Sequence, residues 1–401
     1  MKKKVILAFS GGLDTSYCAK YLSAVKGFDV HSAIVNTGGF SSGELDRIGQ
    51  TALKLGVSSH TVLDVMEEYY QNCIRYMVYG NVLRNNTYPL SVSSERTFQA
   101  LALVRYAKKN NADAIAHGST GAGNDQVRFD SAFKILAPEL EIIAPIREMK
   151  LSRQQEIEFL KKNNIDGDWK KSAYSINKGI WGTSVGGKET LTSHQPLPDE
   201  AFPGQLLKTI PENIGLGFNR GEICSVNGQV IEDKIKLINE IENIASKFAI
   251  GRDIHVGDTI IGIKGRVGFE AAAALVIIKA HHALEKHVLT KWQLHYKEYL
   301  SNIYGMMLHE AQYFEPVMRD IEAFLESNQQ NVTGRVLLKL MPYHFQVQGI
   351  ESEFDLMSSK FGNYGEENKM WTAQDVVGFT NIMSNQMKIY HMVNNPDKSG
   401  D

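Results

Sequence analysis

The residues best suited to chemistry near the start of the chain form the string Ser10-Gly11-Gly12-Leu13-Asp14-Thr15-Ser16. A buried strand is predicted before it, at residues 4–9, and a helix after it, at residues 15–22. The two glycines allow positive φ angles and let a ligand approach the main chain. The hydroxyl groups and the free N–H groups of the helix N-terminus favour an anion. The pattern therefore predicts a phosphate-binding turn.

An ordinary strand–helix turn capped by serine and aspartate would also fit this string. The Walker pattern GxxxxGK[ST] is absent, and no lysine follows the glycines, so the turn is not a P-loop of that kind.

A second polar string, HGSTGAGNDQVRF, occupies residues 117–129 and follows another short apolar segment. Its three glycines predict a main chain wrapped closely around a ligand. Thr120, Asn124, Asp125 and Arg128 offer a hydroxyl, an amide, a carboxylate and a guanidinium. An arginine can hold a carboxylate through two parallel hydrogen bonds. A polar loop ending in an Asn-Asp helix cap is the alternative interpretation.

Strand-like and helix-like patterns alternate along the first part of the chain, which predicts a parallel sheet covered on both faces. The first polar string follows the strand at residues 4–9, where such a sheet places its ligand site, and the second follows the short strand at residues 114–117. The expected strands are residues 4–9, 30–35, 59–63, 114–117 and 142–146, and the expected helices are 15–22, 43–55 and 94–109.

The second half mixes strands with long helices, which predicts an α+β region. Its expected strands are residues 216–226, 258–264, 334–340 and 343–349, and its expected helices are 233–248, 270–299 and 372–393.

The length of 401 residues favours two domains. A polar segment at residues 163–171 ends the alternation and marks the predicted boundary. The tail carries Phe379, Ile382 and Met383 among other apolar residues, more than a chain end should expose, which suggests packing against another subunit. We therefore expect a nucleotide-binding domain at residues 1–165, an α+β domain at 166–365 and a helical oligomerisation tail at 366–401.

The composition excludes several classes of partner. A net charge of −2 gives no sign of nucleic-acid or membrane binding, and the longest apolar stretch, residues 271–278, is far shorter than a membrane span. The three cysteines, Cys18, Cys73 and Cys224, are widely spaced without a CxxC pair. This argues against a disulfide framework and a zinc cluster, so we predict no metal-ligating residue and a cytoplasmic location.

The first string resembles the pyrophosphate loop of the N-type ATP pyrophosphatases. Together, the two strings are similar to those of the argininosuccinate synthases, and the resemblance extends over nearly the whole chain. Further matching segments are Tyr88 and Ser93, residues 174–176, 182–184 and 261–266, and the tail at 372–380. The resemblance implies that the second domain is a synthetase domain and that the protein is a homotetramer. It also implies that ATP, with Mg²⁺, activates a citrulline-type ureido compound as an adenylate, which aspartate then attacks.

The resemblance also implies roles for individual residues. It assigns catalysis to three residues, Asp14, Asp125 and Arg128. Those carried over to ATP binding are Ala8, Phe9, Ser10, Gly11, Gly12, Leu13, Asp14, Thr15, Ser16, Val35, Gly118 and Asp125. Thr120, Asn124 and Asp125 are carried over to aspartate, and Tyr88, Ser93, Asn124, Arg128, Ser175 and Ser184 to citrulline.

Several departures from the family pattern lie on the citrulline side. Gly257 and Phe269 stand where the family has a glutamate and a tyrosine, and the glutamate helps to bind the α-ammonium group. An N-acylated citrulline, acetyl or succinyl, would explain both changes, with Lys178, Lys188 or Arg84 as candidates for meeting a succinyl carboxylate. The alternative is that Glu270 or Asp258 takes over the ammonium group.

Two further departures lie in the serine segment. The family's Ser-x-Asp-x-Asn reads Ser175-Ile176-Asn177-Lys178-Gly179 in this chain.

Two other functions remain open at this point. A tRNA-thiolating enzyme would need catalytic cysteines and a basic face, which the charge and cysteine spacing disfavour. A non-catalytic nucleotide-binding module would not need the polar groups of residues 118–129.

Overall fold

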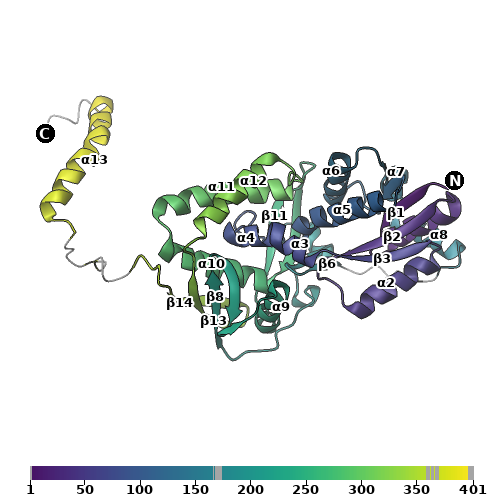
Figure 1. Cartoon of the computed structure of the whole chain (residues 1–401), viewed down its shortest axis with the longest axis horizontal. Coiled ribbons are helices and arrows are strands. Elements are labelled where there is room, and N and C mark those ends of the chain that lie inside the picture. Colours follow the sequence, from purple (N-terminus) through teal and green to yellow (C-terminus); the bar gives the residue numbers. More distant parts are fainter. Residues whose placement is uncertain are drawn as a thin grey trace. The chain divides into compact units, whose positions relative to one another are not determined.

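A five-stranded parallel sheet forms the N-terminal part of the computed structural model, with the strand order β3-β2-β1-β4-β5 (Figure 1). The structure describes residues 2–165, 167, 174–357, 362, 365 and 370–395. The sheet confirms the alternation expected from the sequence. Its strands are β1 (Lys4–Ala8), β2 (Asp29–Asn36), β3 (Ser59–Asp64), β4 (Ala114–Ala116) and β5 (Glu141–Ile143).

Helices cover both faces of this sheet because the side chains of β1 alternate between two apolar cores. Val5 and Leu7 lie in the core shared with α1 (Leu13–Lys20) and α8 (Arg153–Lys162), whereas Ile6 lies in the core shared with α5 and α6. The other helices of this part are α2 (Ser42–Lys54), α3 (Met66–Tyr69), α4 (Arg75–Tyr79), α5 (Ser91–Lys109), α6 (Asp125–Leu136) and α7 (Pro145–Met149).

The second half contains two antiparallel sheets, with strand orders β10-β9-β8-β13-β14 and β11-β12-β7-β6. Four helices pack with them: α9 (Lys234–Ala245), α10 (Ala272–Val288), α11 (Lys291–His309) and α12 (Pro316–Asn328). The strands are β6 (Ser175–Gly179), β7 (Gly182–Gly186), β8 (Glu212–Asn219), β9 (Glu222–Val226), β10 (Gln229–Val230), β11 (Arg252–Asp258), β12 (Lys264–Glu270), β13 (Gly334–Met341) and β14 (His344–Glu351).

Helix α5 connects the two halves. It packs on β1 and β2 of the parallel sheet and also on β6 and β7 of an antiparallel sheet. One apolar core runs through both halves, from Ile6 to Leu340. Residues Met1–Glu353 accordingly form one unit and Phe354–Asp401 a second. Most of the segment predicted as a boundary, residues 163–171, lies outside the described residues.

Four predicted elements were wrong, because each predicted range contains a turn or an element boundary that the sequence pattern did not indicate. Residues 145–146 begin α7, since Pro145 occupies a first-turn position of that helix. Residues 216–226 form a hairpin that turns at Arg220 and Gly221, which both have positive φ. Residues 258–264 span the turn between β11 and β12. Residues 270–299 contain two helices, separated at Leu289 and Thr290, where Thr290 forms a capping box with Gln293.

The expected hairpin after residue 334 and the tail helix are both present. The tail helix is α13 (Ala373–Asn394), and Thr372 caps it by accepting from the N–H of Asp375. Apolar side chains of α13 are exposed, among them Phe379 and Ile382. In the described part of the chain, no helix combines the length and the apolar character that a membrane crossing requires.

Candidate active site

The two polar strings meet where the strand order of the parallel sheet reverses. The chain passes from β1 through α1 to β2 on one side, while β4 pairs with the other side of β1. The loops after β1 and β4 therefore leave neighbouring strands at the same edge, which is where open α/β sheets bind ligands. A Cβ added to Gly118 would lie 3.2 Å from the main-chain N of Thr15. The second loop thus rests against the N-terminus of α1.

The phosphate turn has the open main chain that its glycines predict. Gly11 has φ +78°, and Gly12 precedes α1 in an extended conformation without a side-chain cap. The Oγ1 of Thr15 donates to the carbonyl oxygen of Gly12 at 3.2 Å and lies 3.4 Å from the Oγ of Ser10. The buried Oγ of Ser16 has no hydrogen-bond partner among the described residues. These hydroxyl and N–H groups can surround an anion at the start of α1.

A second carboxyl group lies beside the phosphate turn. Burial raises the pKa of Glu156, on α8, to about 8, and the neighbouring Asp14 carboxylate adds to the shift. Glu156 is therefore protonated at neutral pH and brings no second negative charge to the place where a triphosphate would bind.

The second loop is held by the helix that follows it. His117 Nε2 lies 2.9 Å from Asp130 Oδ1, and Arg147 donates to Asp130 Oδ2 at 2.7 Å. Burial would raise the pKa of Asp130, but the hydrogen bonds from His117 and Arg147 outweigh it and hold the pKa below its usual value. The Gln126 amide donates to the carbonyl oxygen of Gly121, which closes the loop onto α6.

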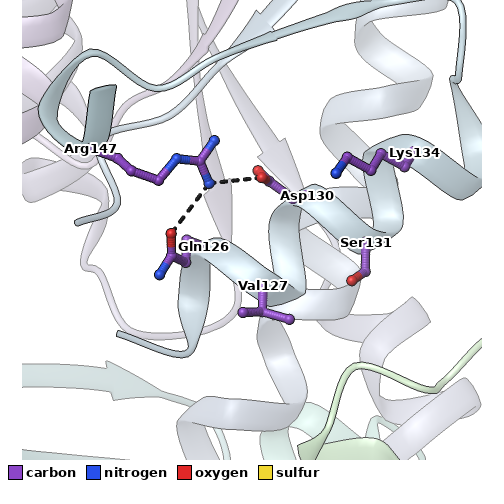
Figure 2. A pocket seen from close by; sticks show the side chains of 6 residues that line it. All are labelled: Gln126, Val127, Asp130, Ser131, Lys134 and Arg147. Atoms are coloured by element: carbon purple, nitrogen blue, oxygen red, sulfur yellow. Dashed lines mark hydrogen bonds and ion pairs between the residues drawn. The ribbon is translucent and has the colours of Figure 1, made fainter. Parts of the chain in front are cut away.

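A shallow, open pocket of about 290 Å³ lies along one face of α6 (Figure 2). Its lining residues include Gln126, Asp130 and Lys134, which recur at helical spacing on that face. Asp125 and Arg128 project from the opposite face of the helix. The pocket is therefore separate from the crevice between the loops.

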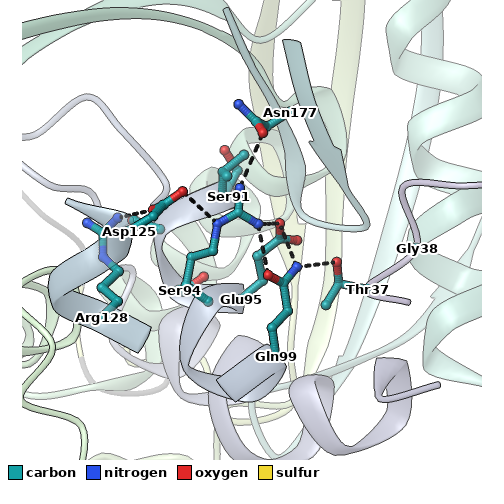
Figure 3. A network of polar contacts seen from close by, with 12 residues as sticks. Thr37, Gly38, Ser91, Ser94, Glu95, Gln99, Asp125, Arg128 and Asn177 are labelled. Atoms are coloured by element: carbon teal, nitrogen blue, oxygen red, sulfur yellow. Dashed lines mark hydrogen bonds and ion pairs between the residues drawn. The ribbon is translucent and has the colours of Figure 1, made fainter. Parts of the chain in front are cut away.

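Asp125 belongs to a polar network in which Glu95 and Arg128 are buried, whereas Asn177 is exposed (Figure 3). Its Oδ2 accepts from Nε of Arg96 and its Oδ1 from Arg128, each at 3.0 Å. Arg96 also donates to Glu95 at 2.7 Å and to Asn177 at 3.3 Å. Burial raises the pKa of Glu95 to about 7, although Arg96 opposes the shift.

Arg128 is engaged differently from what the sequence led us to expect. Its guanidinium is buried, and its Nε and a terminal nitrogen donate to the main-chain oxygen of His309 at 3.2 and 3.0 Å. A further terminal nitrogen donates to Asp125. Most of its donors are thus already used within the protein, which leaves little of the fork for a substrate carboxylate.

Tyr88 and Ser93 lie at the buried start of α5. The Oη of Tyr88 accepts from the main-chain N of Val92 at 3.2 Å, and its ring stacks on His255 at 5.3 Å. Ser93 is buried, and its hydroxyl lies 3.5 Å from the carbonyl oxygen of Leu90. Both residues are therefore buried, and Tyr88 packs against β11.

The remaining predicted residues come from several elements. Asn124 Oδ1 accepts from the main-chain N of Ile260 at 2.9 Å, which ties the second loop to the β11–β12 turn. Ser184 is buried on β7, opposite Asn177, whereas Ser175 is exposed at the start of β6. Val35 is buried on β2, and Thr120 is in the second loop.

The loop after β2 also reaches this region. The carbonyl oxygen of Thr37 accepts from the main-chain N of Ile180 at 2.8 Å. Gly38 has φ +91°, and a Cβ at Gly39 would overlap the carbonyl oxygen of Lys178. The two main chains therefore pack directly against each other, and only glycine fits at this seam.

Sequence reasoning missed Arg96, Glu95, His255 and His309. The first two lie at the start of the helix expected at residues 94–109, where charged residues are common, so they carried no signal of their own. The two histidines are distant in sequence from both loops and carried no such signal.

A glycine turn before α1 and a polar loop meet at the switch point of a parallel sheet, an arrangement typical of nucleotide-binding α/β proteins, and an α+β region follows. Comparison with known proteins gives the family. Residues 4–166 match the family model described as the arginosuccinate synthase N-terminal HUP domain, and residues 174–390 match the arginosuccinate synthase C-terminal domain.

Full-length relatives agree. The chain is 38% identical to the argininosuccinate synthase of Dictyoglomus thermophilum over 391 residues, covering 97% of this chain and 98% of that protein. It is 34% identical to that of Methanocaldococcus jannaschii over 395 residues, covering 98% and 99%. The chain belongs to the argininosuccinate synthase family, and it is a ligase that forms carbon–nitrogen bonds.

The contact between Gly118 and α1 predicts an effect on nucleotide binding. The added Cβ in Gly118→Ala would press on Thr15 and displace the second loop from the phosphate turn, so we expect ATP to bind at least about tenfold more weakly, about 1.4 kcal/mol. Isothermal titration with a non-hydrolysable ATP analogue measures this. Gly123→Ala is the matched control, because a Cβ there meets nothing within 4 Å. Equal affinities for the two variants would contradict the prediction.

Proposed function

We propose that this enzyme joins aspartate to the ureido carbon of citrulline or an N-acylated citrulline and splits ATP into AMP and pyrophosphate. The observation that carries the proposal is the meeting of the phosphate turn and the 118–129 loop at the N-terminus of α1. One loop suits a triphosphate and the other suits an amino acid with two carboxylates. Family membership supports the same reaction.

The reaction has two steps. The ureido oxygen attacks the α-phosphorus of ATP, forming an adenylate as the bond to pyrophosphate breaks. The aspartate amine then attacks the ureido carbon, a carbon–nitrogen bond forms, and AMP leaves with the oxygen. The protein needs no side-chain nucleophile, because its role is to position the reactants and to stabilise negative charge.

In this mechanism the phosphate turn, Ser10 to Ser16, binds the triphosphate, with Val35 and Gly118 bordering the nucleotide. Thr120, Asn124 and Asp125 hold the aspartate. Tyr88, Ser93, Ser175 and Ser184 surround the ureido substrate. Arg128 donates hydrogen bonds to Asp125 and to the main-chain oxygen of His309, so we assign it to the support of both. We also keep it in the site of the ureido substrate.

Mg²⁺ would accompany ATP, neutralising the phosphates. It is usually held by substrate phosphates and one or two carboxylates, so it does not need a dedicated protein cluster. Asp14 is the carboxylate of the phosphate turn and fits this requirement, with the protonated Glu156 beside it.

Sulfur transfer to RNA fits the structure less well. Cys18 and Cys73 are fully buried, and burial raises the pKa of each thiol, so neither is a thiolate at neutral pH. The cysteines are free, which supports a reducing compartment such as the cytoplasm.

Pyrophosphate release tests the reaction. We expect pyrophosphate to be released from ATP only when aspartate and a ureido compound are both present. Asp125→Asn should lower the rate of release about 100-fold, because it removes the negative charge that faces Arg96 and Arg128. A coupled pyrophosphate assay measures both. Release that needs neither amino acid would contradict the proposal.

The identity of the ureido substrate depends on the surroundings of Gly257. A Cβ at this position would lie 2.6 Å from Nε2 of His255, so the histidine ring already fills the space of a side chain there. His255 stacks on Tyr88 and is near Arg84 and His309. Burial, with Arg128, Arg84 and His255 nearby, lowers the pKa of His309 to about 3. Both histidines are therefore uncharged at neutral pH, and the positive charges near them are those of Arg84 and Arg128, which pair with Glu310 and Asp125.

Both carboxylates that could replace the family's glutamate already form ion pairs. Glu270 forms an ion pair with Arg252 at 2.9 Å, and Asp258 forms one with Lys264 at 2.7 Å. This favours an N-acylated citrulline, in which the α-nitrogen is uncharged. We expect kcat/KM for N-acetyl- or N-succinylcitrulline to exceed that for free citrulline at least tenfold. Steady-state kinetics with the three compounds decide this, and a preference for free citrulline would reject the acyl substrate while leaving the ligase reaction intact.

The tail helix supports a homotetramer. Exposed apolar side chains such as Val377, Phe379 and Met383 would be covered by other copies of the chain. A chain ending at Gly365 should elute as a smaller species than the full-length protein in light scattering after gel filtration. An unchanged mass would show that α13 does not hold the subunits together.

A further inference from the structure

The guanidinium of Arg96 connects the two predicted amino-acid subsites. Its Nε donates to Asp125 at the start of α6, and one terminal nitrogen donates to Asn177 on β6 at 3.3 Å. The other terminal nitrogen donates to Glu95 at 2.7 Å and to Gln99 at 3.1 Å, both on α5. Figure 3 shows Asp125 and Asn177 on different sides of this network. One planar side chain thus fixes elements that are far apart in sequence.

Glu95 is the buried carboxyl partner of this arginine. Its side chain is 1% exposed, and its second oxygen has no hydrogen-bond partner among the described residues. That oxygen lies against Gly179, where an added Cβ would collide with it. The carboxylate therefore fits only because residue 179 has no side chain.

This arrangement gives a physical account of the two departures in the serine segment. The family pattern Ser-x-Asp-x-Asn has a carboxylate where this chain has Asn177, and a larger side chain where it has Gly179. Here the neutral Asn177 offers Arg96 only an amide oxygen, while Glu95 on α5 offers it a carboxyl oxygen at 2.7 Å. Gly179 provides the room for it.

We propose that Arg96 is a positioning residue for the ligation step, and that Glu95 supplies the carboxyl partner for it that Asn177 lacks. This rests on the proposed function. Arg96 acts through Asp125, which holds aspartate, and through β6, which borders the ureido substrate. The attacking amine and the ureido carbon must come within roughly 3–3.5 Å, and a displacement of about 1 Å can cost about 100-fold in rate.

A purely structural ion pair is the competing explanation, because breaking a buried pair also destabilises a protein. The two explanations differ in what they predict for kcat at temperatures where each variant is fully folded. They differ again in whether moving the carboxylate from α5 to β6 restores activity.

The experiment compares four full-length variants with the wild type by pyrophosphate release and by thermal melting. Arg96→Lys keeps the charge but loses the planar fork, and we expect kcat to fall 10–100-fold with the KM for ATP within about threefold. Glu95→Gln should lower kcat about tenfold. Adding Asn177→Asp to Glu95→Gln should restore at least half of the wild-type kcat. Arg105→Gln, on the exposed side of the same helix where it pairs with Glu68, is the control and should change nothing.

Three results would overturn the proposal. The first is a kcat for folded Arg96→Lys equal to that of Arg105→Gln. The second is a Glu95→Gln defect that Asn177→Asp does not repair although both variants melt like the wild type. The third is a wild type that is inactive with every ureido compound, which rejects the proposed function itself and is recognised before any variant is made.

Discussion

The reversal of strand order beside β1 is the constraint on which the rest of the site depends. Because β2 and β4 lie on opposite sides of β1, the connections from β1 and β4 run over opposite faces of the sheet. Their first residues therefore separate at the carboxyl edge and leave a crevice between them. Gly118 lies against the start of α1, which brings the two loops close together. The side chains of β1 are anchored in the cores on both faces of the sheet.

Helix α5 extends this arrangement into the second half of the chain. It begins beside Tyr88, carries Glu95 and Arg96 in its second turn, and packs on strands of two different sheets. A polar network within such a core is costly unless its members are paired. Here the charges of Arg96 and Arg128 face that of Asp125, and the carboxyl group of Glu95 accepts a hydrogen bond from Arg96. The chemistry that we assign to the crevice thus shares its residues with the interface between the halves.

The parts of the structure that could be predicted are those specified by local sequence. The phosphate turn, the glycine-rich loop and the parallel sheet follow from short strings and from alternation, and each is present. Interrupted elements were harder, because the capping box at Thr290 and the turn at Gly221 are weak local signals within long apolar patterns. The partners of Arg128 and Arg96 could not be predicted, since His309 and Asn177 approach them only through the tertiary fold. The same holds for His255, which fills the space above Gly257.

The seam between the loop after β2 and strand β6 has a consequence for how the protein is made. Thr37, Gly38 and Gly39 contact Lys178 and Ile180, which are synthesised much later. Contacts between such distant parts of a chain form late, because the long intervening segment must first be ordered. During translation, the N-terminal sheet can form while this loop still lacks the main chain that supports it. A nascent chain would therefore form its parallel sheet before the loop after β2 gains the main chain of β6 that supports it.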